Sequence, residues 1–183
     1  MKRLFLNLIL GLVIFFFLGN AKPTFLAEDS VLVINKIKIE ITGNSTVGKY
    51  NCSNFFTKKD TVYINSIKKN IFNTEIKMSN FDCGNKIMTK DLQGTVKIKQ
   101  FPNSTVCIKD IRSVGKNYKC NLTFLITNKT LQYKDFILYS DDNKIQGSLN
   151  LKFSDIDLEP PTKMAGLIKV KDEIAINFSL YKN

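Results

Sequence analysis

The chain has 183 residues, and its 27 Lys and Arg against 16 Asp and Glu give a formal net charge of +11. It contains no histidine, which excludes Ser-His and Cys-His nucleophilic centres and metal sites built on imidazole. The length is that of a single domain with a sizeable core.

The N-terminal residues predict an export signal. Residues 1–3 are a positive start, and residues 4–18 are a nearly unbroken apolar run. A spanning helix needs about 20 apolar residues, so the run is short for a membrane anchor. Small residues stand where a signal peptidase requires them, and we expect cleavage after Ala21. The prediction is a signal peptide over residues 1–21 and one exported domain over residues 22–183; an uncleaved anchor is the alternative.

Apolar and polar residues alternate with period two along most of the chain after residue 30, which predicts β-strands. In residues 31–41 we expect one apolar face made of Val31, Val33, Ile37, Ile39 and Ile41. In residues 71–78 we expect Phe72, Ile76 and Met78 to point inward. The alternation recurs in the segments 61–67, 104–111, 120–127, 131–140, 144–153 and 173–181. Turn residues such as Gly43-Asn44 stand between the segments, so antiparallel hairpins are expected.

One helical segment interrupts the alternation. Residues 84–96 (GNKIMTKDLQGTV) place Met88 and Leu92 one helical turn apart. This spacing predicts a short helix, which ends before Phe101-Pro102.

A second interruption stands before the last strand, at residues 160–170 (PPTKMAGLIKV). Proline cannot donate to a sheet ladder, so the preceding strand must end there. Pro161 suits the first position of a short helical turn, and Gly166 suits its end. We expect this segment to cap one end of the β-structure. Met164 and Leu167 would then either plug the interior or line its mouth.

About eight antiparallel strands with one or two short helical segments indicate an all-β domain. Such strands close into a barrel or pack as a sandwich. A barrel of about eight strands is wide enough to hold one small or elongated ligand, whereas a sandwich fills its own interior. The 14 Phe and six Tyr suit both, because a tunnel and a core use the same residue types.

Four cysteines, Cys52, Cys83, Cys107 and Cys120, lie in the exported part. An even number in an oxidising compartment predicts disulfides. Their spacing fits no C-x-x-C redox or zinc motif, so no metal or cofactor is expected. Three pairings are open. We favour Cys52 with Cys83, because both border strand-like runs and flank one compact segment. Cys107 and Cys120 could meet across a hairpin, although their spacing places them about one residue out of register.

Neither the carboxylates nor the lysines indicate catalysis or nucleic-acid binding. Asp155 and Asp157 are the nearest approach to an acid/base pair, but a solvated turn explains them better. No Gly-rich phosphate loop is present. Nucleic-acid readers use arginine forks and clustered basic patches, whereas only Arg112 lies beyond residue 3 and the lysines are spread along the strands. The positive charge predicts a weak attraction to anionic membrane surfaces.

The order of segments resembles that of the YceI-like family of exported bacterial proteins. The resemblance is carried by ITGNSTVGKYNC, FDCGNKIMTKDLQGTVKIKQFPNSTVCIKDI, YKCNLTFLITNKTLQYKDF and GSLNLKFSDIDLEPPTKMAGLIKVKDEIAINFSLY, from about Val31 to Tyr181. The matching positions are Phe101-Pro102 for the aromatic-Pro turn, Leu122-Thr123 with Lys129 for the hairpin, and Ser154-Asp155-Ile156 for the Ser-Asp-Phe element. The family's frequent Arg-Asp-x-His-Leu is Thr89-Lys90-Asp91-Leu92 here, so contacts made by that Arg or His are absent.

The resemblance implies a lipocalin-like antiparallel β-barrel whose interior holds an extended amphiphile, in some members a polyisoprenoid. We therefore expect a non-enzymatic protein, periplasmic or secreted, that binds a long-chain lipid or isoprenoid-like molecule. The residues expected around this ligand are Phe81, Met88, Leu92, Phe101, Phe136, Phe153, Met164 and Leu167. Lys163 or Lys169 would neutralise an anionic head group. The alternative is an exported interaction or structural domain with a filled core that acts through its cationic surface.

Overall fold

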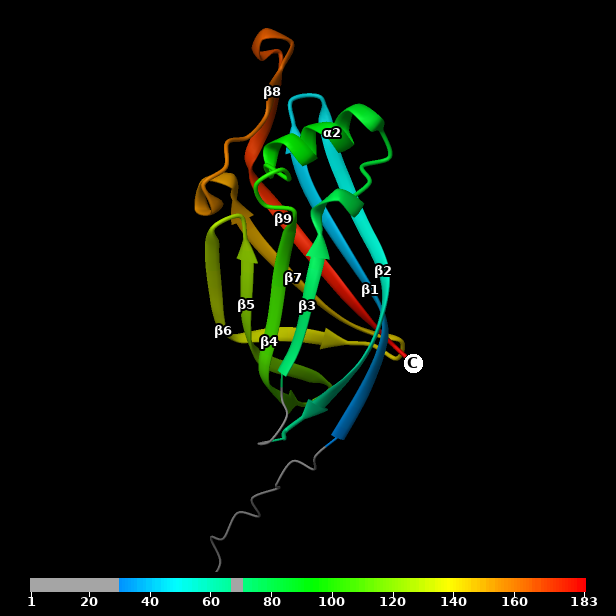
Figure 1. Ribbon diagram of the computed structural model, residues 1–183. Helices are drawn as coiled ribbons and strands as arrows, with labels where there is room; N and C mark the ends of the chain where they lie inside the picture. The colour runs from blue at the N-terminus through cyan, green and yellow to red at the C-terminus, as the bar shows by residue number, and fades with distance from the viewer. Residues whose placement is uncertain (1–29, 67–70) are drawn as a thin grey trace, which may run out of the picture.

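The computed structural model describes residues 30–66 and 71–183 (Figure 1). The predicted signal peptide lies outside these residues. The elements in chain order are β1 (Ser30–Ser45), β2 (Gly48–Ile64), β3 (Ile71–Lys77), η1 (Met78–Asn80), α2 (Lys86–Thr95), β4 (Asn103–Val114), β5 (Asn117–Ile126), β6 (Lys129–Ser140), β7 (Lys144–Lys152), η2 (Phe153–Ile156), β8 (Thr162–Lys163), η3 (Met164–Gly166) and β9 (Ile168–Lys182).

Eight of the described strands form one antiparallel sheet in the order β2-β1-β9-β7-β6-β5-β4-β3, and this sheet curls into a nearly closed barrel (Figure 1). β8 lies off this path and pairs with β9. Most neighbouring strands share long ladders. β6 and β7 pair only at Tyr139–Gln146 and Ser140–Ile145, next to the turn that joins them, whereas β6 pairs with β5 along most of its length. The all-β barrel of about eight strands predicted from the sequence is confirmed.

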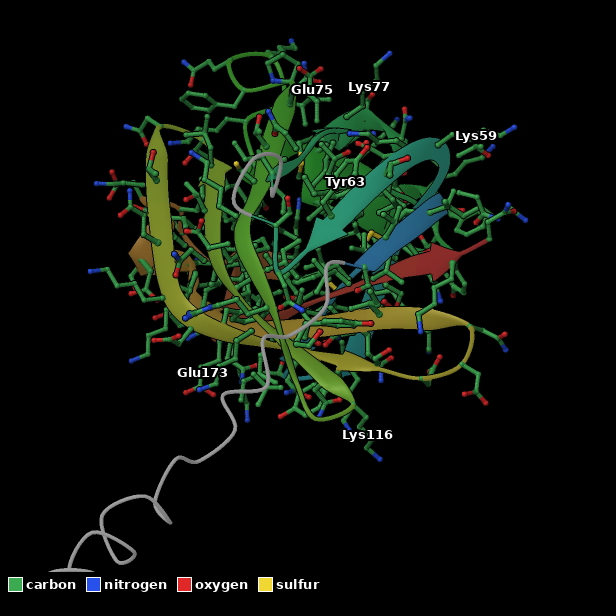
Figure 2. The ribbon with its side chains drawn as sticks, turned by 90° about the horizontal axis from the view of Figure 1, so that it is seen from below. Lys59, Tyr63, Glu75, Lys77, Lys116 and Glu173 are labelled. Carbon is green, nitrogen blue, oxygen red and sulfur yellow. A yellow bond between two sulfur atoms is a disulfide. The ribbon has the colours of Figure 1, made fainter. Side chains whose placement is uncertain are left out.

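Side chains on the inner face of the barrel form one apolar core. The inward positions predicted around β3 are confirmed, since Phe72, Ile76 and Met78 are 1%, 2% and 3% exposed. Lysines stand on the opposite face of the strands, and Figure 2 shows Lys77 and Lys116 pointing away from the barrel. Because successive strand residues point to opposite faces, the alternation in the sequence becomes an apolar core and a cationic surface.

At its N-terminal end, the inner face of β1 is shifted by one residue from the prediction. Ile34 is fully buried, whereas Val31 and Val33 are 56% and 44% exposed. The register of β1 with both of its neighbours breaks between Ile34 and Lys36. One residue inserted as a β-bulge exchanges the two faces of a strand, so the inward placement predicted for the two valines is wrong. Beyond the bulge the prediction is confirmed, for Ile37, Ile39 and Ile41.

β1 and β2 form a longer hairpin than the sequence predicts. The strands pair through Gly43–Tyr50 to Ser45–Gly48, and the chain reverses at Thr46-Val47, so the turn predicted at Gly43-Asn44 is wrong. A Cβ at Gly43 would overlap the ring of Tyr50, its partner across the two strands. The glycine therefore allows the aromatic ring to cover the backbone of β1.

The two edge strands of the sheet, β2 and β3, are held together beside a disulfide. Cys52 and Cys83 form this disulfide, with a sequence separation of 31, and the pairing predicted from the sequence is confirmed. Asn54 is the inward residue that follows on β2, and its Nδ2 donates to the carbonyl oxygen of Lys77 at 3.1 Å. This bond satisfies a side chain that is only 2% exposed, since a buried amide needs a partner.

The other two cysteines are free thiols. Cys107 lies opposite Thr123 in the β4–β5 ladder and points outward, while its neighbour Ile108 points into the core. Cys120 is fully buried, and this burial raises the pKa of its thiol to about 12. The two thiols thus lie on opposite faces of the sheet and do not pair.

The segment after η2 forms a projecting hairpin, which we call the β8–η3 arm (residues 160–168). Thr162 and Lys163 are extended and pair with the start of β9, so the start predicted for the helical turn, at Pro161, is wrong. A short turn, η3, forms only at Met164–Gly166 and ends at Gly166 as predicted. The chain reverses at three consecutive residues with positive φ, which are Met164 (51°), Ala165 (51°) and Gly166 (95°). Figure 1 shows the arm extending past α2 at one end of the barrel.

α2 confirms the predicted helix and lies over the same end of the barrel (Figure 1). Its N-cap is Asn85, whose Oδ1 accepts the backbone N–H of Ile87 at 2.8 Å and of Met88 at 3.4 Å. Such a cap satisfies amides that have no partner within the helix. No helix in the described part of the chain is long and apolar enough to cross a membrane.

Candidate ligand-binding site

An apolar pocket of about 550 Å³ lies at the end of the barrel that α2 covers, and we call it the mouth pocket. Its walls come from the β1–β2 turn, α2, the start of η2, the β8–η3 arm and the start of β9. Its main apolar members are Val47, Ile87, Met88, Leu92, Phe153 and Met164. A volume of about 300–1,000 Å³ with mainly apolar walls is typical of small-molecule sites.

α2 presents an apolar side to the pocket. Ile87 and Met88 stand at its first turn, and Leu92 stands one turn after Met88, so one side of the helix contributes three apolar side chains. Leu92 also packs against the barrel core. The helix thus forms the roof of the mouth pocket and joins it to the core beneath.

Polar contacts hold the walls of the mouth pocket together. Lys163 Nζ on the arm lies 2.7 Å from Asp91 Oδ1 on α2. The β1–β2 turn is bonded to the arm and to the start of β9, since Thr46 Oγ1 donates to the carbonyl of Leu167 at 2.9 Å and Thr46 N–H donates to the carbonyl of Lys169 at 3.0 Å. Three segments that are distant in sequence are therefore fixed around one opening.

The barrel interior beneath the mouth pocket is nearly filled. Its apolar void has a volume of about 30 Å³ and is lined by side chains that include Phe81, Met78 and Phe178. This volume is about the share of one water molecule in the liquid. In this conformation the side chains of the strands pack the interior as a core.

Of the predicted ligand residues, Met88, Leu92, Phe153 and Met164 come together in the mouth pocket. Phe81 lines the interior void. The remaining three lie outside both cavities, and they are Phe101, Phe136 and Leu167.

The residues outside the cavities have identifiable surroundings. Phe136 stacks on Phe178 with ring centroids 6.0 Å apart, and both rings cover Gly147. Leu167 is 74% and Met164 is 67% exposed. The arm therefore does not plug the barrel, and Met164 lies at the mouth, which was the other predicted option.

Sequence reasoning missed the wall contributed by the β1–β2 hairpin. Val47, Tyr50 and Cys52 all line the mouth pocket, but residues 48–60 lack a clean apolar alternation and were not expected to form a strand. The signal that could have located the wall is the pair Gly43 and Tyr50, because a glycine in a strand often marks a place where an aromatic ring covers the backbone.

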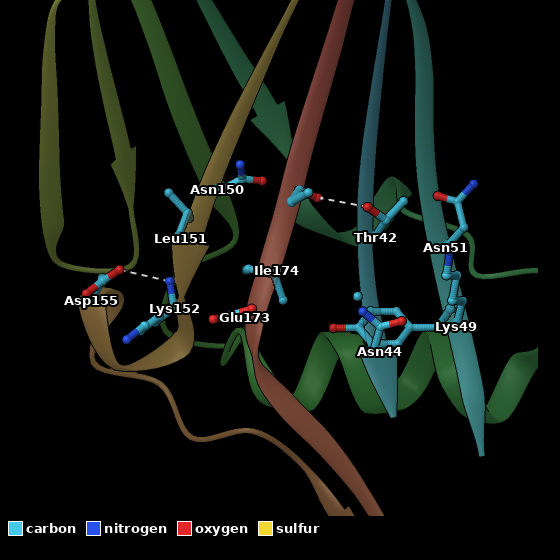
Figure 3. Close-up of a pocket in the computed structure, with 13 residues that line it drawn as sticks. Thr42, Asn44, Lys49, Asn51, Asn150, Leu151, Lys152, Asp155, Glu173 and Ile174 are labelled. Atoms are coloured by element: carbon cyan, nitrogen blue, oxygen red, sulfur yellow. Dashed lines mark hydrogen bonds between the residues drawn. The ribbon is translucent and has the colours of Figure 1, made fainter. Parts of the chain in front are cut away.

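A second, more open hollow of about 860 Å³ lies nearby, and its lining mixes polar and apolar groups (Figure 3). It is lined by side chains such as Asn51, Asn150, Lys152 and Glu173 from β2, β7 and β9. Tyr50 lines both this hollow and the mouth pocket. Amides and charges of both signs make this hollow less suited to an apolar chain than the mouth pocket is.

The hydroxyl of Tyr50 is buried and has no hydrogen-bond partner in the described part of the chain. Burial raises the pKa of Tyr50 to about 12. An unpaired buried hydroxyl costs free energy, since it has left water without a replacement bond.

The two carboxylates considered as an acid/base pair make structural contacts instead. Asp155 accepts the backbone N–H of Lys152 at 2.8 Å, as Figure 3 shows. Asp157 lies 2.7 Å from Lys129 Nζ and ends η2 with a φ of 52°. Both carboxylates stabilise the turn after β7, in agreement with the solvated-turn interpretation. Among the described residues, no group of three His, Cys, Asp or Glu is placed to hold a metal ion.

Comparison with solved structures relates this fold to known proteins. A polyisoprenoid-binding domain from Saccharophagus degradans, described as implicated in plant cell wall breakdown, matches with a TM-score of 0.58 and 12% identity, over 85% of this chain and 99% of that domain. A YceI protein from Campylobacter jejuni matches with a TM-score of 0.43 and 18% identity, over 90% of this chain and 86% of that protein. No protein-family model matches the sequence, and no curated protein matches it.

The resemblance drawn from the sequence is thus confirmed at the level of the fold. The match to the Saccharophagus degradans domain extends over nearly all of that domain. The chain therefore has the fold of a solved polyisoprenoid-binding domain over most of its length.

Proposed function

We propose that the protein is an exported, non-enzymatic binding protein that holds a long apolar lipid-like molecule. The observation that carries this proposal is the mouth pocket, an apolar space of about 550 Å³ at one end of the barrel. The apolar surface that lines a pocket of this size costs free energy while it contacts water, and a ligand that covers this surface removes the cost. Four of the residues expected to contact the ligand, Met88, Leu92, Phe153 and Met164, line it.

In this proposal an apolar tail lies against α2 and Phe153, and a polar head stays at the rim. Lys163 lines the pocket but already pairs with Asp91, whereas Lys169 is exposed beside the arm. Lys169 is therefore the better partner for an anionic head group. A longer chain would extend toward Phe81 only if side chains of the interior core move, because the void there is about 30 Å³.

A polyisoprenoid is the specific candidate for the ligand. One support is the fold shared with the domain that is described as polyisoprenoid-binding. The other is the mainly apolar lining of the mouth pocket, because a polyisoprenoid chain needs no polar contacts to be held there. Phe101, Phe136 and Leu167 lie outside the pocket, so their predicted contacts would require a ligand longer than the pocket.

The compartment follows from two independent features. The Cys52–Cys83 disulfide is typical of proteins in an oxidising environment, and the first residues have the composition of a signal peptide. We propose a periplasmic or secreted location in a bacterium. This is also where a carrier of apolar chains is useful, because such chains cannot cross water unaccompanied.

The alternative is an interaction or structural domain that acts through its cationic surface. The observation that favours it is the nearly filled barrel interior, since a void of about 30 Å³ accommodates no lipid chain. The two functions differ in salt dependence. Binding through surface lysines falls steeply as salt rises, whereas retention of a lipid in an apolar pocket does not.

Organic extraction and mass spectrometry of the purified protein test the proposal, followed by binding of a polyprenol and of palmitic acid. Met164→Glu places a charge at the mouth and should abolish retention of lipid. Ile71→Glu is the matched control, because Ile71 is similarly exposed, at 62% against 67%, and lies outside the mouth pocket. Absence of extracted lipid together with no binding of either probe would refute the proposal.

Substitution of Phe153 shows whether this residue forms a wall of the ligand pocket or only packs the core. Phe72→Ala, in the closed core, should cost about 3–5 kcal/mol of the free energy of unfolding and leave lipid retention unchanged. Phe153→Ala should cost less, because Phe153 borders existing empty space, and should weaken retention. An equally large loss of stability for both variants, with retention unchanged in both, would show that Phe153 belongs to the core alone.

A further inference from the structure

The mouth end of the barrel carries a cluster of exposed apolar side chains on three projecting segments. Val47 on the β1–β2 turn is 73% exposed, Ile87 on α2 is 71%, and Met164 and Leu167 on the β8–η3 arm are 67% and 74%. Figure 1 shows the three segments at the same end of the molecule. We call these four side chains the apolar tips.

The tips are held together by the fold. Thr46, which precedes Val47, bonds to the main chain of Leu167 and Lys169, and Lys163 on the arm pairs with Asp91 on α2. Met164 and Ala165 both adopt the left-handed conformation, which costs free energy for a residue with a side chain. Such strain at exposed apolar residues is expected where the projection itself has a function.

Lysines outnumber carboxylates in the segments that carry the apolar tips. The three segments with their flanks, residues 43–50, 82–100 and 159–173, contain eight lysines and five carboxylates, which are those of Asp82, Asp91, Glu159, Asp172 and Glu173. In the neighbouring turn after β7, Asp157 is paired with Lys129 and Asp155 accepts a backbone N–H. The mouth end is therefore apolar at its tips and carries a net positive charge in the segments around them.

We propose that the mouth end is a docking surface for an anionic phospholipid bilayer, in which the apolar tips enter the interface and the surrounding lysines contact the head groups. Apolar side chains on segments rich in lysine match the two layers of such a membrane, an apolar interior beneath negative head groups. A soluble protein partner would not require the charge, and an acidic polymer would not require the tips.

This surface would place the mouth pocket against the bilayer, so that a lipid passes between them without crossing water. That route rests on the proposed function, whereas docking itself does not.

Co-sedimentation with vesicles tests the docking surface. The full chain should bind vesicles made from an equal mixture of phosphatidylcholine and phosphatidylglycerol, and bind pure phosphatidylcholine far less. Leu167→Ser and Ile87→Ser should each weaken binding about tenfold, because one aliphatic side chain no longer enters the interface. Ile71→Ser, at a similarly exposed aliphatic residue (62%) outside the mouth pocket, is the matched control and should bind as the unaltered protein does.

The contribution of the lysines to vesicle binding is tested separately. Lys86→Gln and Lys90→Gln should each weaken vesicle binding about fivefold, since each lysine near an anionic surface contributes about 1 kcal/mol. Neither lysine lines the mouth pocket, so retention of a polyprenol should not change. Lys109→Gln and Lys116→Gln, on β4 and the β4–β5 turn, are controls of the same charge change and should leave vesicle binding unchanged.

The outcomes separate docking from lipid retention. Vesicle binding that is lost with Leu167→Ser and with the α2 lysines supports the docking surface, whether or not a lipid is retained. Equal binding to an acidic polysaccharide, with no effect of Leu167→Ser or Ile87→Ser on vesicle binding, would assign the surface to polyanions and overturn the proposal. Equal loss of binding for the control lysines would show attraction by net charge only, which also overturns it.

Discussion

Ser53 on β2 and Asp82, which precedes α2, exchange two backbone hydrogen bonds with N–O distances of 2.8 and 2.9 Å. They form an isolated bridge between the edges of the sheet, directly beside the Cys52–Cys83 disulfide. Further along the seam, Lys58 Nζ donates to the carbonyl of Asn73. A lysine on an edge strand also discourages pairing with a second chain. The barrel is thus closed by a short bridge and a covalent bond instead of a continuous ladder.

The disulfide should therefore have a large effect on stability. Replacing Cys52 and Cys83 with serine removes a crosslink across 31 residues and should lower the free energy of unfolding by about 3–4 kcal/mol in the chain-entropy model. Denaturant unfolding of the double variant and of the unaltered protein measures the difference. Cys107→Ser is the control, because Cys107 is a half-exposed free thiol, and it should change stability little. A double variant as stable as the control would contradict the importance of the seam.

The bulge in β1 predicts opposite tolerance of charge at two adjacent residues. Ile34→Asp places a carboxylate at a fully buried position, whereas Val33→Asp places it where the native side chain is 44% exposed. Burial of an unpaired charge is prohibitive, so Ile34→Asp should prevent folding. Val33→Asp should remain folded, with a loss of about 1 kcal/mol or less. Circular dichroism and thermal unfolding compare the two, and the reverse ranking would mean that β1 has no bulge at this point.

Gly147 should not tolerate a side chain. A Cβ there would lie 2.5 Å from Phe178 Cζ and 2.8 Å from Phe136 Cε1, so two aromatic rings would have to move. Gly147→Ala should lower the free energy of unfolding by about 1–3 kcal/mol. Gly94→Ala is the control, because Gly94 lies in α2 with open space around its Cα, and alanine should stabilise the helix by up to about 1 kcal/mol. A neutral Gly147→Ala would show that the Phe136–Phe178 stack is loosely packed.

The phenol of Tyr50 should make stability depend on pH in the alkaline range. Burial raises the pKa of Tyr50 from 10.0 to about 12, so the folded state holds the phenolic proton more strongly than the unfolded state. The resulting contribution is complete below pH 10 and is lost as the pH rises toward 12. Tyr50→Phe removes this titration and also an unpartnered buried hydroxyl.

Measurements of unfolding for Tyr50→Phe and the unaltered protein near pH 7 and near pH 11 test this expectation. At the lower pH the variant should be equal in stability or more stable by about 1 kcal/mol, and its relative stability should increase at the higher pH. Tyr63→Phe, at a 36% exposed ring, is the control. A variant that loses more than this at neutral pH would indicate that the hydroxyl has a bonding partner, such as a ligand head group.

Local pattern was enough to predict much of this protein. The alternation in β3, β7 and β9, the helical spacing of Met88 and Leu92, and the Cys52–Cys83 pair were all foreseen, because each depends on residues that are near in sequence or on the compartment. Period two in a strand directly encodes which side chains face the core. For the same reason an all-β fold of about eight strands could be predicted.

Tertiary structure decided what local pattern does not encode. The bulge after Ile34 is set by pairing with β2 and β9 on both sides of β1, and the β8–η3 arm is extended because it pairs with β9. The candidate site depends on volume, which results from side chains of every strand together. Phe81 and Phe153 look alike in sequence, but the space around Phe81 is nearly filled, whereas Phe153 borders the mouth pocket. The sequence does not show this difference, because only closure of the barrel determines how much space remains around each side chain.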